Sequence, residues 1–176
     1  TRVAATYRIG EQGGLSLTDN PFDLAINGQG FFQIQLPDGD TGYTRDGSFQ
    51  LNADGQLVNA DGFPLIPNIT IDQAAVGITI NQNGQVLLKF DGQQAETIAG
   101  TVQLATFQNK AGLEHIGRNL LKTTEASGAA TTANPGTAGF GTLEQGFVEA
   151  SNVDPVQEIT DLIQAQRGYE LNSKVI

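Results

Sequence analysis

The chain has 176 residues, of which 39% are hydrophobic, and its 19 acidic residues outnumber its 9 basic ones to give a net charge of −10 at pH 7. This length suits one domain, or one domain with an appendage, and is enough to bury a working core. The acidic balance argues against nucleic-acid binding and against binding to anionic membranes, because phosphate groups would repel such a surface and no Lys/Arg cluster offsets it.

The residue types that are missing or abundant narrow the possible class of protein further. The chain contains no Cys, which excludes disulfides, thiolate metal sites and cysteine nucleophiles. No apolar run approaches the length needed to span a bilayer. The 22 glycines and 6 prolines favour a turn-rich β protein.

In chain order, the first expected element is a strand in RVAATYRI (2–9), where apolar residues occupy alternate positions. From Leu15 onward short apolar segments alternate with turn residues, and the segment 101–107 reads as a further strand. The stretch 123–141 is rich in small and polar residues and is expected to be a loop. The fold class predicted is therefore mainly β, with short antiparallel strands and hairpins in one domain.

Asn-Gly and Asp-Gly pairs recur between these strands. Such pairs adopt the positive φ angles that tight hairpin turns need, so they are interpreted as turns and not as ligands or catalysts. The predicted turn residues are Asn27, Gly28, Asp38, Gly39, Asp46, Gly47, Asp54, Gly55, Asp61, Gly62, Asn83 and Gly84, and Asp91-Gly92 forms a further pair.

The apolar residues between the turns are expected to build the β core. They are Phe22, Leu24, Ile26, Phe31, Phe32, Phe49, Leu51 and Phe63.

The last 26 residues, 151–176, have a different character. Asp154 is expected to cap a helix that begins at Pro155, with Gln157 three residues after the cap. The apolar stripe of this helix is thin, so a lone helix would be weak and needs partners. The chain starts at Thr1 without Met and stops at Ile176 with no helix stop signal, so it is expected to be a piece of a longer protein.

No catalytic, cofactor-binding or metal-binding residue is predicted, and the chain is not expected to be an enzyme. His115 is the only histidine, and nothing at a recognisable spacing completes a catalytic or metal site around it, so a surface histidine is the interpretation. PDGDTG (37–42) lacks the late Glu of a calcium loop. Gly28 and Gly30 lack the third glycine and the helix of a dinucleotide fingerprint.

Two long segments resemble known proteins. SLTDNPFDLAINGQGFFQIQLPDGDTGYTRDGSFQLNADGQLVNADGFPL is similar to the shared region of the bacterial flagellar rod and hook proteins, and EQGFVEASNVDPVQEITDLIQAQRGYELNSKVI is similar to their carboxy-terminal region. The short middle region argues against a hook protein with its inserted domain. GLEHIGRNLLKTTEASGA is most similar to the distal rod proteins, with proximal rod proteins as the alternative.

The resemblance implies a structural subunit of the flagellar basal body. Such subunits leave the cell unfolded through the flagellar type III export system and polymerise helically into the drive shaft that crosses the periplasm and transmits torque to the hook. The implied partners are other copies of the chain, proximal rod and hook proteins, and the surrounding ring (bushing) proteins, with no cofactor, nucleic acid or membrane insertion.

The resemblance also implies a division of the chain into a β-rich outer domain, 1–150, and the start of a carboxy-terminal helix, 151–176. The implied subunit-interface residues on that helix are Val156, Ile159, Leu162, Ile163, Gln166, Tyr169 and Ile176. The amino-terminal helix of the family and the end of the carboxy-terminal helix are absent from this sequence, so the chain alone is expected to be monomeric.

Two functions from other classes are kept as alternatives. A secreted carbohydrate-binding module would need exposed aromatic residues that stack on sugar, and the chain has no Trp and only 3 Tyr. A hydrolase that works with paired carboxylates would need two acids brought together in space, which sequence spacing does not reveal.

Overall fold

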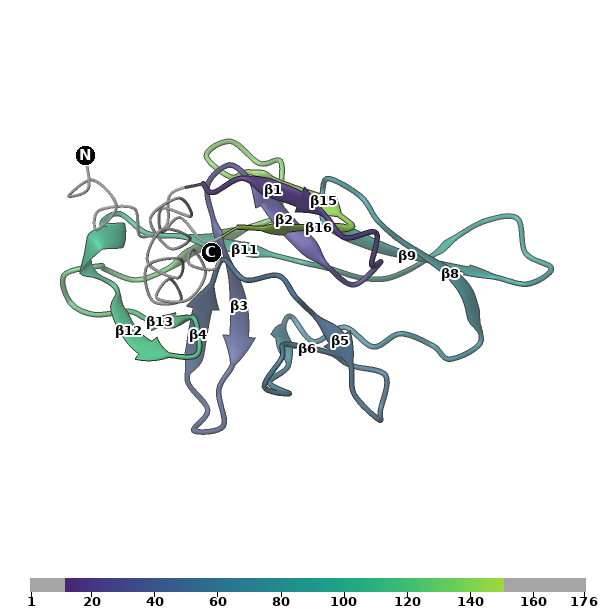
Figure 1. Ribbon diagram of the computed structural model, residues 1–176, viewed down its shortest axis with the longest axis horizontal. Coiled ribbons are helices and arrows are strands. Elements are labelled where there is room, and N and C mark those ends of the chain that lie inside the picture. The colour runs from purple at the N-terminus through teal and green to yellow at the C-terminus, as the bar shows by residue number, and fades with distance from the viewer. Residues whose placement is uncertain (1–11, 151–176) are drawn as a thin grey trace, which may run out of the picture.

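The computed structural model describes residues 12–150, and these form a mainly β structure with a single 3₁₀ turn in that range (Figure 1). This confirms the predicted fold class. The expected strand at 2–9 lies outside the described residues. The expected helix from Pro155, with Asp154, Gln157 and the interface residues Val156, Ile159, Leu162, Ile163, Gln166, Tyr169 and Ile176, also lies outside them.

The largest sheet forms the centre of the molecule. Its strand order is β12-β13-β4-β3-β11-β14, and β7 also pairs with β3. The strands are β3 (Phe31–Gln35), β4 (Thr41–Thr44), β7 (Leu65–Ile66), β11 (Leu104–Thr106), β12 (Glu114–Gly117), β13 (Leu120–Lys122) and β14 (Thr131–Ala133), and the 3₁₀ turn η1 (Lys110–Gly112) precedes β12.

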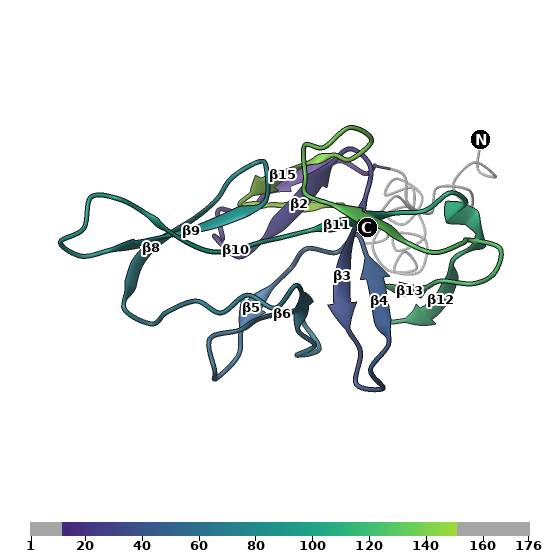
Figure 2. The same ribbon diagram turned by 180° about the vertical axis from the view of Figure 1, so that it is seen from behind.

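A three-stranded antiparallel sheet extends from one end of the body. Its order is β10-β9-β8, from β8 (Ala75–Ile80), β9 (Gln85–Phe90) and β10 (Thr97–Thr101). The β12–β13 hairpin lies at the opposite end of the long axis, which gives the molecule an elongated shape (Figures 1 and 2).

Three two-stranded ribbons complete the structure. They are β1 (Leu15–Leu17) with β16 (Phe147–Glu149), β2 (Leu24–Asn27) with β15 (Thr142–Gln145), and β5 (Gln50–Leu51) with β6 (Leu57–Val58).

The core lies on both faces of β3. Successive strand residues point to opposite faces of a sheet, so Phe31 and Phe32 enter different hydrophobic clusters. The Phe32 ring packs edge-on against Phe49 with centroids 5.1 Å apart, and Phe31 packs against Phe107 at 5.7 Å. A doubled phenylalanine in one strand therefore holds two layers together.

Most of the predicted core residues are buried, with one exception. Leu24, Ile26, Phe31, Phe32 and Phe49 are at most 3% exposed, and Phe22 and Phe63 pack half-buried against the core. Leu51 is 37% exposed, so the prediction for this residue was wrong. It belongs to β5, a two-residue strand whose residues are both exposed.

Three turns are stabilised in the same way by the side chain of an asparagine. In the turn 52–55, the Asn52 Oδ1 atom accepts the backbone N–H groups of Asp54 and Gln56, each at 2.9 Å. Gly55, at φ 81°, closes the turn by donating its N–H to the Asn52 carbonyl. The turns at 59–62 and 81–84 repeat these contacts from Asn59 and Asn81. The Asn three positions before the glycine is thus as much a part of the turn as the Asp-Gly or Asn-Gly pair.

Asp46-Gly47 differs from the expected tight turn. Gly47 has no positive φ, and its carbonyl accepts the Leu24 N–H at 2.9 Å. A Cβ atom at position 47 would lie 1.7 Å from the Leu24 carbonyl oxygen. The glycine is needed because two backbone segments approach closely, which the dipeptide pattern does not distinguish from a turn.

Two local predictions in the second half of the chain also need correction. The expected loop 123–141 contains β14, which pairs with β11 in register Leu104–Ala133. The expected strand 101–107 is interrupted, since β10 ends at Thr101 and β11 begins at Leu104. Between them, the Val102 N–H donates to the Gly84 carbonyl at 2.8 Å, which bends the chain out of the sheet.

Candidate functional site

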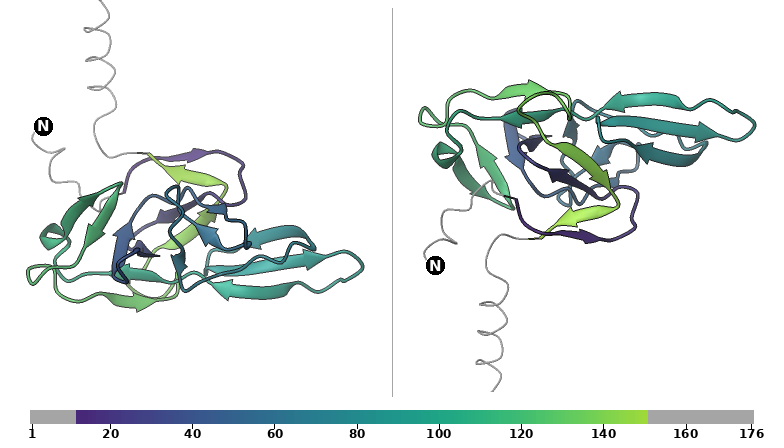
Figure 3. Two further views of the ribbon diagram at one scale, coloured as in Figure 1. Left: turned by 90° about the horizontal axis from the view of Figure 1, so that it is seen from below. Right: turned by 90° about the horizontal axis from the view of Figure 1, so that it is seen from above.

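The two ends of the described range lie side by side. β1 and β16 are antiparallel, with Leu15 opposite Glu149 and Leu17 opposite Phe147 (Figure 3). The Ala150 N–H donates to the Gly14 carbonyl at 2.7 Å, which continues the pairing to the last described residue. The ribbon therefore brings the first and last described strands of the β body together.

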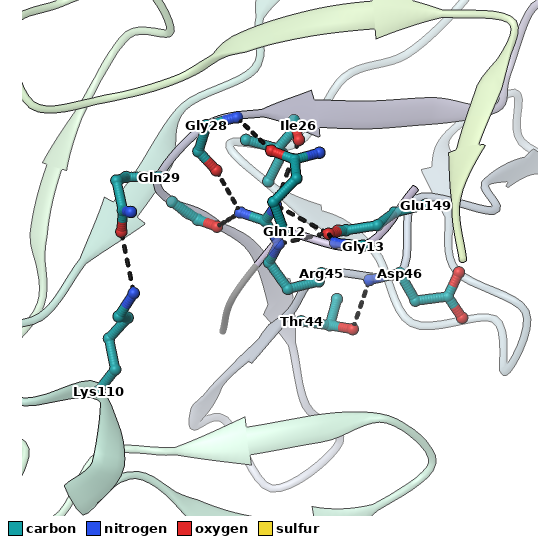
Figure 4. Close-up of polar contacts among 11 residues, drawn as sticks. Gln12, Gly13, Ile26, Gly28, Gln29, Thr44, Arg45, Asp46, Lys110 and Glu149 are labelled. Carbon is teal, nitrogen blue, oxygen red and sulfur yellow. Dashed lines mark hydrogen bonds and ion pairs between the residues drawn. The ribbon is translucent and has the colours of Figure 1, made fainter. Parts of the chain in front are cut away.

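Arg45 directly follows β4, and every nitrogen of its guanidinium donates hydrogen bonds (Figure 4). Its Nε and Nη2 atoms donate to the two carboxylate oxygens of Glu149 at 2.9 and 3.1 Å. The other three N–H groups reach backbone carbonyls, those of Gly28 at 2.8 Å, Gly30 at 2.7 Å and Ile26 at 3.2 Å. All five donors of the arginine are therefore satisfied.

Glu149 ties the beginning of the described chain to the same point. Its Oε2 atom also accepts the backbone N–H of Gly13, and the Gln12 Oε1 atom accepts the Gly28 N–H at 2.6 Å (Figure 4). We call Arg45, Glu149 and these backbone partners the Arg45–Glu149 cluster. The cluster joins the segment before β1, the β2–β3 loop, the end of β4 and β16.

The cluster is mostly shielded from solvent. The side chain of Arg45 is 13% exposed and that of Glu149 is 5% exposed. Removing one partner of a buried, hydrogen-bonded ion pair leaves an uncompensated charge and costs roughly 3–5 kcal/mol. A pair with every donor satisfied is a rigid connection, because each side chain has one arrangement that keeps its hydrogen bonds.

The β2–β3 loop folds so that its carbonyls converge on the arginine. Gly28 and Gly30 have φ angles of 123° and 131°, which L side chains rarely adopt. These conformations direct both carbonyl groups toward the Arg45 Nη1 atom. Gln29, between them, accepts a hydrogen bond from the Lys110 ammonium at 3.0 Å, which attaches η1 to the same loop (Figure 4).

Sequence reasoning missed both members of the ion pair. Arg45 and Glu149 are 104 residues apart, and no local pattern links them. The sequence did contain one signal, because Arg45 is a basic residue in an acidic chain. It lies between a predicted strand and the Asp46-Gly47 pair, where a turn does not require a charged side chain.

The predicted turn residues do not converge on one site. Asp38 and Asp40 flank Lys122, whose ammonium is 2.7 Å from Asp40. The hydrogen bond from the Asp40 backbone N–H, aided by Lys122, lowers the pKa of Asp38. His115 is exposed on β12. Within residues 12–150, no group of three His, Cys, Asp or Glu side chains is placed to hold a metal ion.

Within the same residues, no helix is long and apolar enough to cross a bilayer.

Two family models match the chain. Residues 25–88 match the flagellar hook protein FlgE/F/G D1 domain, and residues 144–176 match the carboxy-terminal region of the flagellar basal body rod FlgEFG proteins. Arg45 lies in the first matched region and Glu149 in the second. The ion pair therefore connects the two, as does the pairing of Ala25 in β2 with Glu144 in β15.

Curated relatives match the chain along nearly its whole length. The flagellar basal-body rod protein FlgG of Caulobacter vibrioides is 55% identical over 175 residues, which cover 99% of this chain and 67% of the relative. FlgG of Buchnera aphidicola subsp. Acyrthosiphon pisum is 49% identical with the same coverage. The rod protein FlgF of Caulobacter vibrioides is 36% identical over 169 residues, 94% of this chain and 64% of the relative.

Proposed function

The chain belongs to the family of flagellar hook and basal-body rod proteins, and from that premise we propose that it is a structural subunit of the distal rod, the drive shaft that transmits torque to the hook. Members of this family are part of the flagellar basal body and assemble with other rod and hook components. The distal rod is chosen because the chain has a higher sequence identity to FlgG than to FlgF. The chain is 55% identical to FlgG and 36% identical to FlgF of the same organism.

In this role the Arg45–Glu149 cluster connects the β body to the parts of the subunit that hold the polymer together. We propose that residues 1–150 are the outer part of the subunit and that residues 151–176 begin the inner helix. The second half of β15 and all of β16 belong to the carboxy-terminal matched region, yet they pair with β2 and β1 in the β body. Four strands and a buried ion pair would make the body turn with the helix.

The proposed partners are other copies of the chain, proximal rod and hook proteins, and the ring proteins around the rod. Membership of a structural family argues against the carbohydrate-binding module and against the hydrolase, and we propose that the chain catalyses no reaction.

A graft into Caulobacter vibrioides tests the proposal. The segment of its FlgG that matches this chain, 67% of that protein, is replaced by residues 1–176, and swimming in soft agar and rods in isolated basal bodies are scored in cells that lack native FlgG. We expect the FlgG chimera to restore both. The matched control is the same replacement in FlgF, which we expect to fail in cells without FlgF. Rescue by the FlgF graft alone would assign the chain to the role of FlgF and contradict the proposal.

A further inference from the structure

The Asn-Gly and Asp-Gly pairs share a chemical liability as well as a preference for turns. In each pair the glycine backbone nitrogen can attack the Cγ atom of the residue before it, because glycine has no side chain to obstruct the approach. The attack closes a succinimide ring. The chain contains seven such pairs, Asn27-Gly28, Asp38-Gly39, Asp46-Gly47, Asp54-Gly55, Asp61-Gly62, Asn83-Gly84 and Asp91-Gly92. Their surroundings in the fold differ, and these differences decide which pair reacts.

In four of the pairs a backbone hydrogen bond occupies the glycine nitrogen. The N–H group donates to the carbonyl of the residue three positions earlier, at 2.9 or 3.0 Å, and the donors are Gly39, Gly55, Gly62 and Gly84. In these turns the glycine is the last residue, so its N–H closes the turn. The nitrogen cannot approach the neighbouring Cγ atom until the turn opens.

The Asn27-Gly28 pair is held from both sides by contacts of the Arg45–Glu149 cluster. The Gly28 N–H donates to the Gln12 Oε1 atom at 2.6 Å, and the Gly28 carbonyl accepts the Arg45 Nη1 atom at 2.8 Å. The protection of this nitrogen therefore depends on a side chain from the first described residue.

The Asp46-Gly47 pair is held through its carboxylate. The Asp46 Oδ1 atom accepts the Ser48 backbone N–H at 3.1 Å, and the Oδ2 atom accepts the Asn119 side chain at 3.3 Å. Gly47 is buried. Here the carboxyl group that the nitrogen would attack is fixed by two hydrogen bonds.

The Asp91-Gly92 pair lies in a turn of a different kind. The Gln93 N–H donates to the Phe90 carbonyl at 3.1 Å, so glycine is the third residue of this turn and its own N–H is not the one that closes it. Gly92 has a φ of 81°, and both residues of the pair are exposed. Within residues 12–150, nothing accepts the Gly92 N–H and nothing donates to the Asp91 carboxylate.

The elements around this turn leave room for a ring and for a longer backbone. The β9–β10 loop forms the free end of the three-stranded sheet (Figure 1), and a Cβ atom at position 92 would meet nothing within 4 Å. Outer strands at both ends of the molecule have register irregularities, which are Ala75/Gly77 in β8, Ile98/Gly100 in β10 and His115/Gly117 in β12. A bulged ladder already accommodates an unpaired residue, so a lengthened turn does not require β9 and β10 to separate.

We propose that Asp91-Gly92 is the site at which the folded chain spontaneously forms a succinimide and isomerises to isoaspartate. The Gly92 nitrogen forms a bond to the Asp91 Cγ atom, and its proton leaves as water with the hydroxyl of the protonated carboxyl group. Solvent water then opens the ring. Breaking the original peptide bond leaves Gly92 attached through Cγ, which is isoaspartate, whereas breaking the new bond restores aspartate. This modification goes beyond the proposed function and does not depend on it.

Peptide mapping of the aged 176-residue chain tests the proposal. The folded protein is incubated for weeks at neutral pH, digested and analysed by liquid chromatography with mass spectrometry, and isoaspartate is also labelled with an isoaspartyl methyltransferase. We expect at least several-fold more isoaspartate at Asp91 than at Asp38, Asp46, Asp54 or Asp61. In urea, where the turns are open, all the Asp-Gly pairs should react at similar rates. Equal amounts in the folded chain, or more at another pair, would overturn the proposal.

Asp91→Asn allows identical dipeptides to be compared within one molecule. Asparagine reacts by the same ring closure, except that ammonia leaves in place of water, and hydrolysis gives a heavier product that mass spectrometry detects. Position 91 should deamidate at least several-fold faster than Asn27 and Asn83, although all three precede glycine. The substitution alters one exposed turn side chain, so the fold is kept. Deamidation of Asn83 as fast as at position 91 would contradict the proposal.

Gln12→Ala tests whether hydrogen bonding of the glycine N–H provides the protection. The variant removes the acceptor of the Gly28 N–H, so we expect deamidation at Asn27 to rise several-fold. Asn83 is the matched control, because the glycine after it keeps its hydrogen bond to Asn81 and its rate should not change. An unchanged rate at Asn27 would show that this hydrogen bond does not select among the pairs, which would remove the reason for choosing Asp91.

Discussion

The Arg45–Glu149 cluster and the β8–β10 sheet are stabilised in opposite ways. The cluster joins residues that are 104 apart in sequence, is mostly shielded from solvent, and satisfies every donor of one arginine. The β8–β10 sheet is built from strands that follow one another in the chain, and its turn at 81–84 closes on its own Asn81. The difference shows where the molecule is specified by long-range contacts and where by local sequence, and substitutions in each region should separate the two.

The largest effect is expected from removing the carboxylate of the cluster. Glu149→Ala should lower the free energy of unfolding by roughly 3–5 kcal/mol, because it leaves the buried Arg45 charge without its partner. Urea denaturation of the 176-residue chain measures this change. The control is Glu144→Ala on β15, where the carboxylate makes one exposed hydrogen bond to Gln82, and where we expect a change within about 0.5 kcal/mol. Equal effects at the two positions would contradict the role given to the cluster.

The same substitution at two glycines, one two residues after Arg45 and the other on β8, should have different effects on stability. Gly47→Ala places a Cβ atom 1.7 Å from the Leu24 carbonyl oxygen and should cost about 1–3 kcal/mol, because backbone must move. Gly77→Ala on β8 meets nothing closer than the Lys89 Cβ atom at 3.7 Å and should be neutral or stabilise by about 0.4–1 kcal/mol. Thermal unfolding of both variants decides the matter, and a destabilised Gly77→Ala would show that the β8 bulge itself needs glycine.

A smaller effect is expected at the asparagine turns. Asn52→Ala removes the acceptor of two backbone N–H groups and should cost roughly 1 kcal/mol. Gln56→Ala removes only the side-chain hydrogen bond from Asn52 and should cost a few tenths of that, roughly 0.3 kcal/mol. If chemical denaturation shows the two variants to be equally stable, the backbone contacts of Asn52 contribute little.

The smallest effect at neutral pH is expected at Tyr43, whose burial raises its pKa. The neutral phenol is the form that the folded protein favours, so this contribution to stability is complete below the unfolded pKa of about 10 and is lost as pH rises through the folded value. Tyr43→Phe should therefore leave stability at pH 7 nearly unchanged and flatten its decline above pH 10. Denaturation curves recorded between about pH 8 and 12 check this. A variant that declines as steeply as the parent chain would assign the alkaline loss to other groups.

The sequence predicts well the features that depend on neighbouring residues. Alternating apolar residues and turn pairs are local signals, and they were enough for the mainly β class and for most of the core around Phe31 and Phe32. The prediction that Leu51 is in the core was wrong because its strand, β5, pairs only with β6. Alternation of apolar residues does not indicate whether a second layer covers such a strand. The prediction of a tight turn at Gly47 was wrong because glycine is required both in tight turns and where two backbone segments approach closely.

The candidate site could not be predicted in the same way. The geometry of Arg45 depends on carbonyls from a loop before it and on a carboxylate far after it, and neither has a sequence pattern of its own. β14 was missed for a related reason. Its threonines and alanine lack a core-forming pattern, and the strand exists because β11 supplies the hydrogen-bonding edge.

The bulged edges of β8, β10 and β12 have a consequence for the free subunit before it is incorporated. A subunit that polymerises, as proposed for this chain, must not nucleate amyloid-like stacks, in which straight strands from separate chains add to one another without limit. At these three strands the irregular edges remove that template while leaving the side-chain surfaces available. Growth can then be confined to the end of an existing polymer, so that order of addition, rather than concentration alone, determines when copies join.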